Sequence, residues 1–228
     1  MRRRANGRGG NRRGRPAAGS TGSARATSEL GRYLDWLERE RGHRGILLEQ
    51  LKNASLAWDL RPGSRLLWFT TTAWMMWNAL VSALLSRGVP VMIDGNPSYP
   101  DLTEQWRLAE ESRAALLGVS PGYVMASRKQ GVEPTRLFDL SSVHQIGCVG
   151  SPLPLEGFSW LQDRFGPDVL VNVTSCGTDV CTAIIGGSPL QPVWAGEMSG
   201  PCLGFSAASV DDHHNRSSVS LVSSSSPR

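Results

Sequence analysis

Paired cysteines, lysine and an N-terminal aliphatic run are all scarce in this sequence of 228 residues. Its four cysteines form no Cys-X-X-Cys pair, which excludes the usual metal and redox motifs and favours buried free thiols. Free thiols in an apolar body are typical of a reducing compartment. The first 25 residues contain no aliphatic segment of the kind that a secretory signal requires. We therefore expect a cytoplasmic location, although an arginine-rich mitochondrial leader, disfavoured by Pro16 and several glycines, stays open.

Acidic residues are absent from the N-terminal segment, and this absence explains the basic character of the chain. Residues 1–25 hold eight arginines and no Asp or Glu. Because the whole chain carries a net charge of +4, the other residues together carry −4. The basic pI therefore does not indicate nucleic-acid binding by the folded part. The tail also has no aromatic residue for base stacking, so a nucleic-acid partner is not expected, and non-specific phosphate contacts by the tail are the alternative.

Composition divides the chain into four segments. Residues 1–28 are rich in arginine and glycine and are predicted to be disordered. Residues 29–44 are predicted to be helical, with an amphipathic helix over 29–40. Residues 45–205 have the apolar patterning of a folded domain, and the serine-rich residues 206–228 are again predicted to be disordered.

Short apolar runs alternate with helical periodicity in the folded segment. We expect helices at residues 46–56, 74–86, 101–111 (capped by Asp101), 121–129 and 155–164. We expect strands at residues 65–70, 89–93, 115–119, 143–149, 169–173 and 182–185. This alternation predicts an α/β fold, with a mostly parallel sheet flanked by helices.

One stretch has the length of a membrane span. Residues 66–86 contain no charged side chain over 21 positions. However, three threonines at 70–72 and Asn78 interrupt this stretch, and its apolar helical part is short. We therefore interpret it as a buried strand, a polar turn and a buried helix, and we expect no membrane span.

Three loops follow strands at the edge where open α/β sheets bind ligands. They cover residues 70–74, 147–154 and 174–179. Taken singly, each is explained by capping, by an ordinary strand-to-helix turn, or by the turn preference of Gly177-Thr178-Asp179. Their hydroxyls, glycines and one carboxylate are also the groups that bind phosphate and Mg²⁺.

The order and spacing of these loops resemble the adenylate-forming superfamily of acyl-CoA synthetases, luciferases and peptide-synthetase adenylation domains. The acetoacetate–CoA ligase family is the most similar, and the resemblance runs almost without gaps from Gly42 to Phe205. It rests on the segments 45–53, 66–78, 94–97, 150–158 and 177–182. The resemblance implies a partial AMP-binding domain over residues 45–205, with 29–44 outside it.

The resemblance also implies an activity. Such ligases join acetoacetate to coenzyme A, with ATP and Mg²⁺, through an acyl-adenylate, and they serve lipid and ketone-body metabolism. The implied partners are therefore the small molecules acetoacetate, ATP and coenzyme A.

Site residues are implied by position within the matched motifs. Thr178 would contact the α-phosphate, Asp179 would help to hold Mg²⁺, and both would be catalytic. The other implied nucleotide contacts are Gly150, Ser151, Pro152 and Gly177. The implied acyl and coenzyme A contacts are Trp74, Met75, Met76 and Cys176, where Cys176 replaces the bulky Trp of acetate-specific relatives and leaves room for a four-carbon oxo acid.

Two parts of the family pattern have no counterpart in this sequence. The glycine- and threonine-rich phosphate loop should lie just upstream of Gly45, where Glu38–Arg44 stands instead. The likeness fades after Gly204, before the lid and its lysine, and neither Lys52 nor Lys129 is placed for that role. We therefore expect a fragment that is inactive alone, from a frameshifted or truncated gene. A non-catalytic nucleotide- or partner-binding remnant is the alternative.

Overall fold

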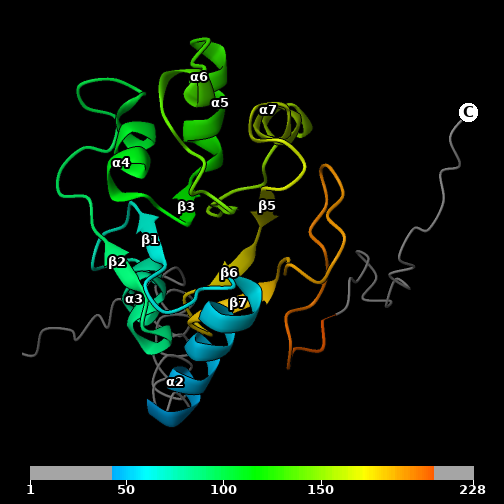
Figure 1. Ribbon diagram of the computed structural model, residues 1–228. Coiled ribbons are helices and arrows are strands. Elements are labelled where there is room, and N and C mark those ends of the chain that lie inside the picture. The colour runs from blue at the N-terminus through cyan, green and yellow to red at the C-terminus, as the bar shows by residue number, and fades with distance from the viewer. Residues whose placement is uncertain (1–42, 208–228) are drawn as a thin grey trace, which may run out of the picture. The chain divides into compact units, whose positions relative to one another are not determined.

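The computed structural model describes residues 43–207. Several sequence predictions lie outside that range. They are the disorder of residues 1–28, the helix at 29–40, and the disorder of the segment 206–228 beyond its first two residues. Within it, five parallel strands form one sheet in the order β2-β1-β3-β4-β5 (Figure 1). The strands are β1 (Arg65–Trp68), β2 (Val89–Val91), β3 (Leu116–Val119), β4 (Gln145–Cys148) and β5 (Leu170–Val173). The predicted α/β class is confirmed.

Helices pack on both faces of this sheet (Figure 1). One face carries α4 (Glu104–Ser112), α5 (Pro121–Lys129), α6 (Pro134–Leu137) and α7 (Leu155–Phe165). The other carries α2 (His43–Lys52), the π-helical turn η1 (Asn53–Ala57), α3 (Met76–Val81) and the 3-10 turn η2 (Ser82–Ser86). A separate hairpin of β6 (Ser175–Gly177) and β7 (Thr182–Ile185) follows β5.

Both faces of the central strands are apolar because both are covered. Leu66 and Leu67 are neighbours in β1 and both are fully buried, yet they belong to two different core clusters. Successive side chains of a strand point to opposite faces, so a strand between two layers of helices needs an apolar residue at every position. This requirement explains the continuous apolar runs in the sequence.

An indole ring lies across the middle of the sheet on the α3 side. Trp68 is paired in register with Gly118 of β3, and Gly118 is paired with Gly147 of β4. A Cβ atom at Gly118 would lie 1.8 Å from Cδ2 of Trp68, and one at Gly147 would lie 2.7 Å from its Cη2. The ring therefore occupies the space that side chains would fill on two neighbouring strands.

Three predictions about local structure were incomplete or wrong. The loop expected at residues 174–179 contains β6, which pairs with β7 in antiparallel fashion. The short helix α6 was not expected, since four residues carry too little periodicity to recognise. The helix expected at 74–86 begins at Met76 and changes to 3-10 geometry at Ser82.

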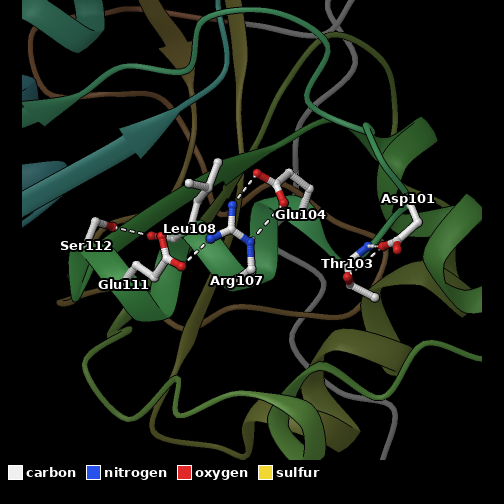
Figure 2. A network of polar contacts seen from close by, with 7 residues as sticks. All are labelled: Asp101, Thr103, Glu104, Arg107, Leu108, Glu111 and Ser112. Atoms are coloured by element: carbon white, nitrogen blue, oxygen red, sulfur yellow. Dashed lines mark hydrogen bonds and ion pairs between the residues drawn. The ribbon is translucent and has the colours of Figure 1, made fainter.

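The start of α4 corrects the predicted cap. The helix begins at Glu104 with Thr103 as its N-cap residue, so Asp101 lies two residues too early. Instead, the Asp101 carboxylate accepts hydrogen bonds from the backbone N–H and the hydroxyl of Thr103, at 2.7 and 2.6 Å (Figure 2). Farther along α4, Arg107 forms ion pairs with both Glu104 and Glu111. These contacts stabilise the turn and the exposed side of the helix.

The Asp101 turn predicts an acid-dependent loss of stability. Hydrogen bonds from Thr103 hold the pKa of the Asp101 carboxyl below its ordinary value. Such a group stabilises the fold above its unfolded-state pKa of about 3.9, and this contribution is lost as the pH falls through the lower folded-state pKa. We expect Asp101→Ala to lower the urea midpoint at pH 6, and the difference from the wild type to shrink toward pH 3. Asp163→Ala, on the exposed side of α7, is the matched control, and an Asp101 difference that does not shrink in acid contradicts this account.

Two further sequence predictions concern the long uncharged stretch and the thiols. Residues 66–86 are divided between β1, a turn, α3 and η2, as interpreted from the sequence. Among residues 43–207, no helix is long and apolar enough to cross a membrane. All four cysteines lie in this range and are free; Cys148 and Cys181 are buried as predicted, whereas Cys176 and Cys202 are only half-buried.

Candidate functional site

A cleft of about 420 Å³ opens at the carboxyl ends of β4 and β5 and beside the loop that follows β1. The cleft brings together seven of the ten residues that the sequence singled out: Trp74, Met75, Gly150, Ser151, Pro152, Cys176 and Thr178. The remaining residues that line it are Leu153, Val173, Thr174, Ser175, Gly196, Glu197 and Met198. Loops from parallel strands meet at one sheet edge, which is why segments about 100 residues apart converge here.

The other three predicted residues lie close to the cleft without lining it. Gly177 is the last residue of β6, and Asp179 is exposed in the turn that follows. Met76 is buried at the start of α3, where only 2% of its surface is exposed. Gly177 and Asp179 are therefore placed next to Thr178 in the hairpin, whereas Met76 is buried and lines a smaller cavity beside the cleft.

A smaller cavity of about 30 Å³, which we call the inner chamber, adjoins the cleft. Met75, Thr174 and Cys176 line both spaces. Residues of α2, η1, β1, α3, β5 and β7 also line the inner chamber: Gln50, Asn53, Ala57, Trp68, Met76, Ala79, Asn172, Thr182 and Ala183. Five residues from connecting segments complete its walls: Trp58, Val149, Gly186, Gly187 and Cys202.

Polar side chains of α2 and η1 hold the hairpin that carries Thr178. The side-chain amide of Gln50 donates to the carbonyl of Cys181 at 2.6 Å, and that of Asn53 donates to the hydroxyl of Thr182 at 2.6 Å. The Thr182 hydroxyl donates in turn to Glu49 at 2.7 Å. These contacts join residues more than 120 positions apart and position the turn at 178–181. Sequence analysis assigned these residues no individual role, because His43, Arg44 and Lys52 are polar too and nothing in the sequence separates buried polar side chains from exposed ones.

A second anchor holds the loop that closes the far side of the cleft. Asn172, in β5, is 1% exposed and bonds both backbone groups of Gly187: the N–H donates to its Oδ1 at 2.8 Å, and its Nδ2 donates to the carbonyl at 3.1 Å. Thr174 also donates to Asn172 Oδ1 at 3.1 Å. The N–H of Gly186 donates to the carbonyl of Gly200 at 2.9 Å. The loop between these glycines brings Glu197 and its neighbours to the cleft, a contribution that sequence analysis missed.

The thiol in the cleft is neutral at physiological pH. Burial raises the pKa of Cys176 above its ordinary value, so the thiol stays protonated and is a poor nucleophile. The side chain therefore contributes a small, largely apolar surface at the boundary between the cleft and the inner chamber.

The oxygen atoms at the cleft suit an anionic ligand accompanied by Mg²⁺. Ser151 and Thr178 supply hydroxyls, Glu197 supplies a carboxylate, and the Asp179 carboxylate lies beside Thr178 in sequence. Among residues 43–207, no group of three or more His, Cys, Asp or Glu side chains is placed to hold a metal ion. One or two carboxylates fit Mg²⁺, which usually takes its remaining ligands from water and substrate phosphates.

Comparisons with known proteins identify relatives of this chain. The acetoacetyl-coenzyme A synthetase of Rhizobium meliloti (strain 1021) is 43% identical over 161 residues, which are 71% of this chain and 25% of that protein. The acetoacetyl-CoA synthetase of Gallus gallus is 29% identical over 168 residues, again 25% of its length. The chain thus spans about a quarter of the curated relatives that it matches. No family model matches it.

Solved structures agree with these relatives. The acetoacetyl-CoA synthetase from Streptomyces lividans superposes with a TM-score of 0.70 and 46% identity, over 75% of this chain and 27% of that one. An anthranilate–CoA ligase in complex with anthranoyl-AMP superposes with a TM-score of 0.66 over 77% of this chain and 33% of that one, and its 14% identity supports the fold alone. The greater part of this chain is therefore homologous to one segment of the acetoacetyl-CoA synthetases, which are acid–thiol ligases, and it has the fold of adenylate-forming enzymes.

Proposed function

We propose that residues 43–207 supply nucleotide and acyl contacts of a ligase that joins acetoacetate to coenzyme A through an acyl-adenylate. One observation carries the proposal: the loops after β1, β4 and β5 converge on a single cleft. This cleft combines exposed hydroxyls, a flat glycine- and proline-bearing wall, and an apolar wall that includes Trp74 and Met75. Such a combination suits phosphate, adenine and a short acyl chain, respectively.

The reaction needs two nucleophilic substitutions. In the first, a carboxylate oxygen of acetoacetate attacks the α-phosphorus of ATP, the bond to the β-phosphate oxygen breaks, and pyrophosphate leaves. In the second, the thiol sulfur of coenzyme A attacks the acyl carbon, AMP leaves, and the thiol proton passes to solvent. Mg²⁺, when bound, neutralises the charge of the phosphates. The task of the protein is to align two anions and to stabilise the charge that builds on the α-phosphate.

The residues of the cleft have separate parts in this proposal. Thr178 donates a hydrogen bond to an α-phosphate oxygen, and Asp179 provides carboxylate oxygen to Mg²⁺. The loop at 150–152 lines the adenine. Trp74 and Met75 shield the acyl group from water, with Cys176 beside the entrance to the inner chamber.

We further propose that this chain binds the nucleotide and acyl groups, whereas turnover needs residues that it does not supply. The match to about 25% of the relatives' length supports this part. The absence of nucleic-acid partners and a cytoplasmic location stay predictions from the sequence.

A binding measurement tests the proposal. The ligand is acetoacetyl-sulfamoyl-adenosine, a stable analogue of the acyl-adenylate, titrated calorimetrically into the full chain. We expect Thr178→Val to weaken binding by about ten- to a hundredfold, because a hydrogen bond to a charged group contributes roughly 1.5–3 kcal/mol. Thr135→Val makes the same change at an exposed position of α6 outside the cleft and is expected to bind as the wild type does.

Turnover is measured separately. Incubation with ATP, Mg²⁺ and acetoacetate, with and without coenzyme A, is expected to release no pyrophosphate above background. Release that Asp179→Ala abolishes would show that the chain completes adenylation by itself. Failure of the wild type to bind the analogue would contradict the proposed function.

A further inference from the structure

The side chain of Asn53 is incompletely satisfied in a buried position. Asn53 is 5% exposed, and its Nδ2 donates to the Thr182 hydroxyl. Its Oδ1 is buried and has no hydrogen-bond partner. Buried polar atoms are nearly always paired, so an unpaired one in the wall of a cavity points to a group that enters the cavity. Asn53 and Thr182 both line the inner chamber.

The inner chamber has the dimensions of the end of a small molecule. Its volume of about 30 Å³ has room for roughly two water-sized groups. Most of the remaining wall is apolar and includes Trp68, Met76 and Ala79. Since the chamber and the cleft share Met75, Thr174 and Cys176 as lining residues, the two spaces lie next to each other.

We propose that the inner chamber receives the end of the acyl chain, and that Asn53 is a specificity-determining residue which selects short chains with an oxygen at carbon 3. This inference rests on the proposed function. The terminal methyl and the 3-oxo oxygen of a 3-oxobutanoyl group are two groups of the size that the chamber holds. A longer chain does not fit, and a butanoyl chain fits but brings no partner for the carboxamide.

The hydrogen bonding permits this role because an amide and a hydroxyl can exchange donor and acceptor. With Nδ2 directed at the Thr182 hydroxyl, Oδ1 has no partner, and the carboxamide offers no donor to the chamber. After a half-turn about the Cβ–Cγ bond, Oδ1 accepts from the Thr182 hydroxyl and Nδ2 donates to the 3-oxo oxygen. Glu49 then loses the hydrogen bond from Thr182 but keeps its ion pair with Lys52.

The test compares three sulfamoyl-adenosines by calorimetry on the full chain: 3-oxobutanoyl, butanoyl and unacylated. We expect the wild type to bind the 3-oxobutanoyl compound about tenfold more tightly than the butanoyl compound. Asn53→Asp keeps the size of the side chain and an oxygen that can accept from the Thr182 hydroxyl, but it offers no donor to Thr182 or to the chamber. It is expected to reduce the ratio of the two acyl affinities, measured in the same variant, to about one. Asn78→Asp, at an exposed position of α3, is the control and should retain the preference.

The outcomes separate the two levels of inference. Equal binding of the two acyl compounds by the wild type, or an undiminished preference in Asn53→Asp, overturns the role of Asn53 and leaves the proposed function standing. No binding of the unacylated or acylated compounds by the wild type overturns the proposed function itself. If Asn53→Asp does not fold, as judged by its thermal melt, a crystal structure with the 3-oxobutanoyl compound decides. A 3-oxo oxygen beyond hydrogen-bond distance of Asn53 contradicts the inference.

Discussion

An alanine at position 118 is expected to lower the free energy of unfolding by about 3 kcal/mol, near the upper end of the usual cost of overpacking a core. The added Cβ atom would lie 1.8 Å from an indole carbon of Trp68, a residue that is 3% exposed. The ring packs in one core cluster with residues of η1 and α3, and the inner chamber beside it measures only about 30 Å³, so the ring cannot move away without disturbing this packing. Urea unfolding followed by circular dichroism measures the loss.

Two further variants test whether contact with Trp68 causes the loss of stability in Gly118→Ala. Gly122→Ala, at an exposed position of α5, places its Cβ 3.9 Å from the nearest atom and is expected to be neutral or stabilising by up to about 1 kcal/mol. A double-mutant cycle of Gly118→Ala with Trp68→Leu should show a coupling energy above about 1 kcal/mol, because the smaller side chain relieves the clash. A Gly118→Ala protein with the wild-type midpoint would mean that the indole does not lie on β3.

Asn172→Leu is expected to lower the free energy of unfolding by about 3 kcal/mol as well. The leucine has the same branched shape, although it is larger, and it satisfies neither the N–H nor the carbonyl of Gly187, a buried residue. Each buried backbone group left without a partner costs roughly 1–3 kcal/mol. The loop that brings Glu197 to the cleft also loses its anchor, so binding of acetoacetyl-sulfamoyl-adenosine should weaken.

Hydrogen exchange at Gly187 distinguishes the loss of this anchor from a general loosening of the sheet. We expect the Gly187 amide to exchange faster in Asn172→Leu relative to amides in β3 and β4. Thr174→Val removes only the donor to Asn172 Oδ1 and is expected to cost about 1 kcal/mol. Unchanged protection at Gly187 in Asn172→Leu would rule out the anchoring role.

Local signals predicted the elements that they control. The bounds of α5 agree with the sequence prediction at both ends, because Ser120 caps the helix, Pro121 opens it and Gly131 follows it. The strands β1 and β3 to β5 were predicted to within one to two residues at each end, since two-sided burial demands continuous apolar runs. In contrast, β6 has only three residues, of small size, and its pairing depends on β7 across the turn.

The sequence also predicted in part which residues lie close together in the cleft. The carboxyl ends of parallel strands share one edge of a sheet, so hydroxyls and glycines that follow separate strands were expected to converge, and Ser151 and Thr178 line one cleft. The order of these loops was sufficient to indicate relatives among the acetoacetyl-CoA synthetases. Both inferences use only the direction of the chain and the place of each motif along it.

Contacts between distant segments needed the tertiary structure. Gln50 meets Cys181 across 131 positions, and neither residue type indicates the other as its partner. Likewise, the sequence does not indicate that the Trp68 ring covers Gly118 or that Asn172 bonds the backbone of Gly187. Nor does it indicate that the carboxamide oxygen of Asn53 is buried without a partner. The sequence by itself thus determined the α/β class, the main elements and the loops that meet at the cleft, because these follow from local patterning and strand direction. The tertiary structure alone decided which side chains support the cleft and what lines its inner chamber, because those contacts depend on packing between segments far apart in the chain.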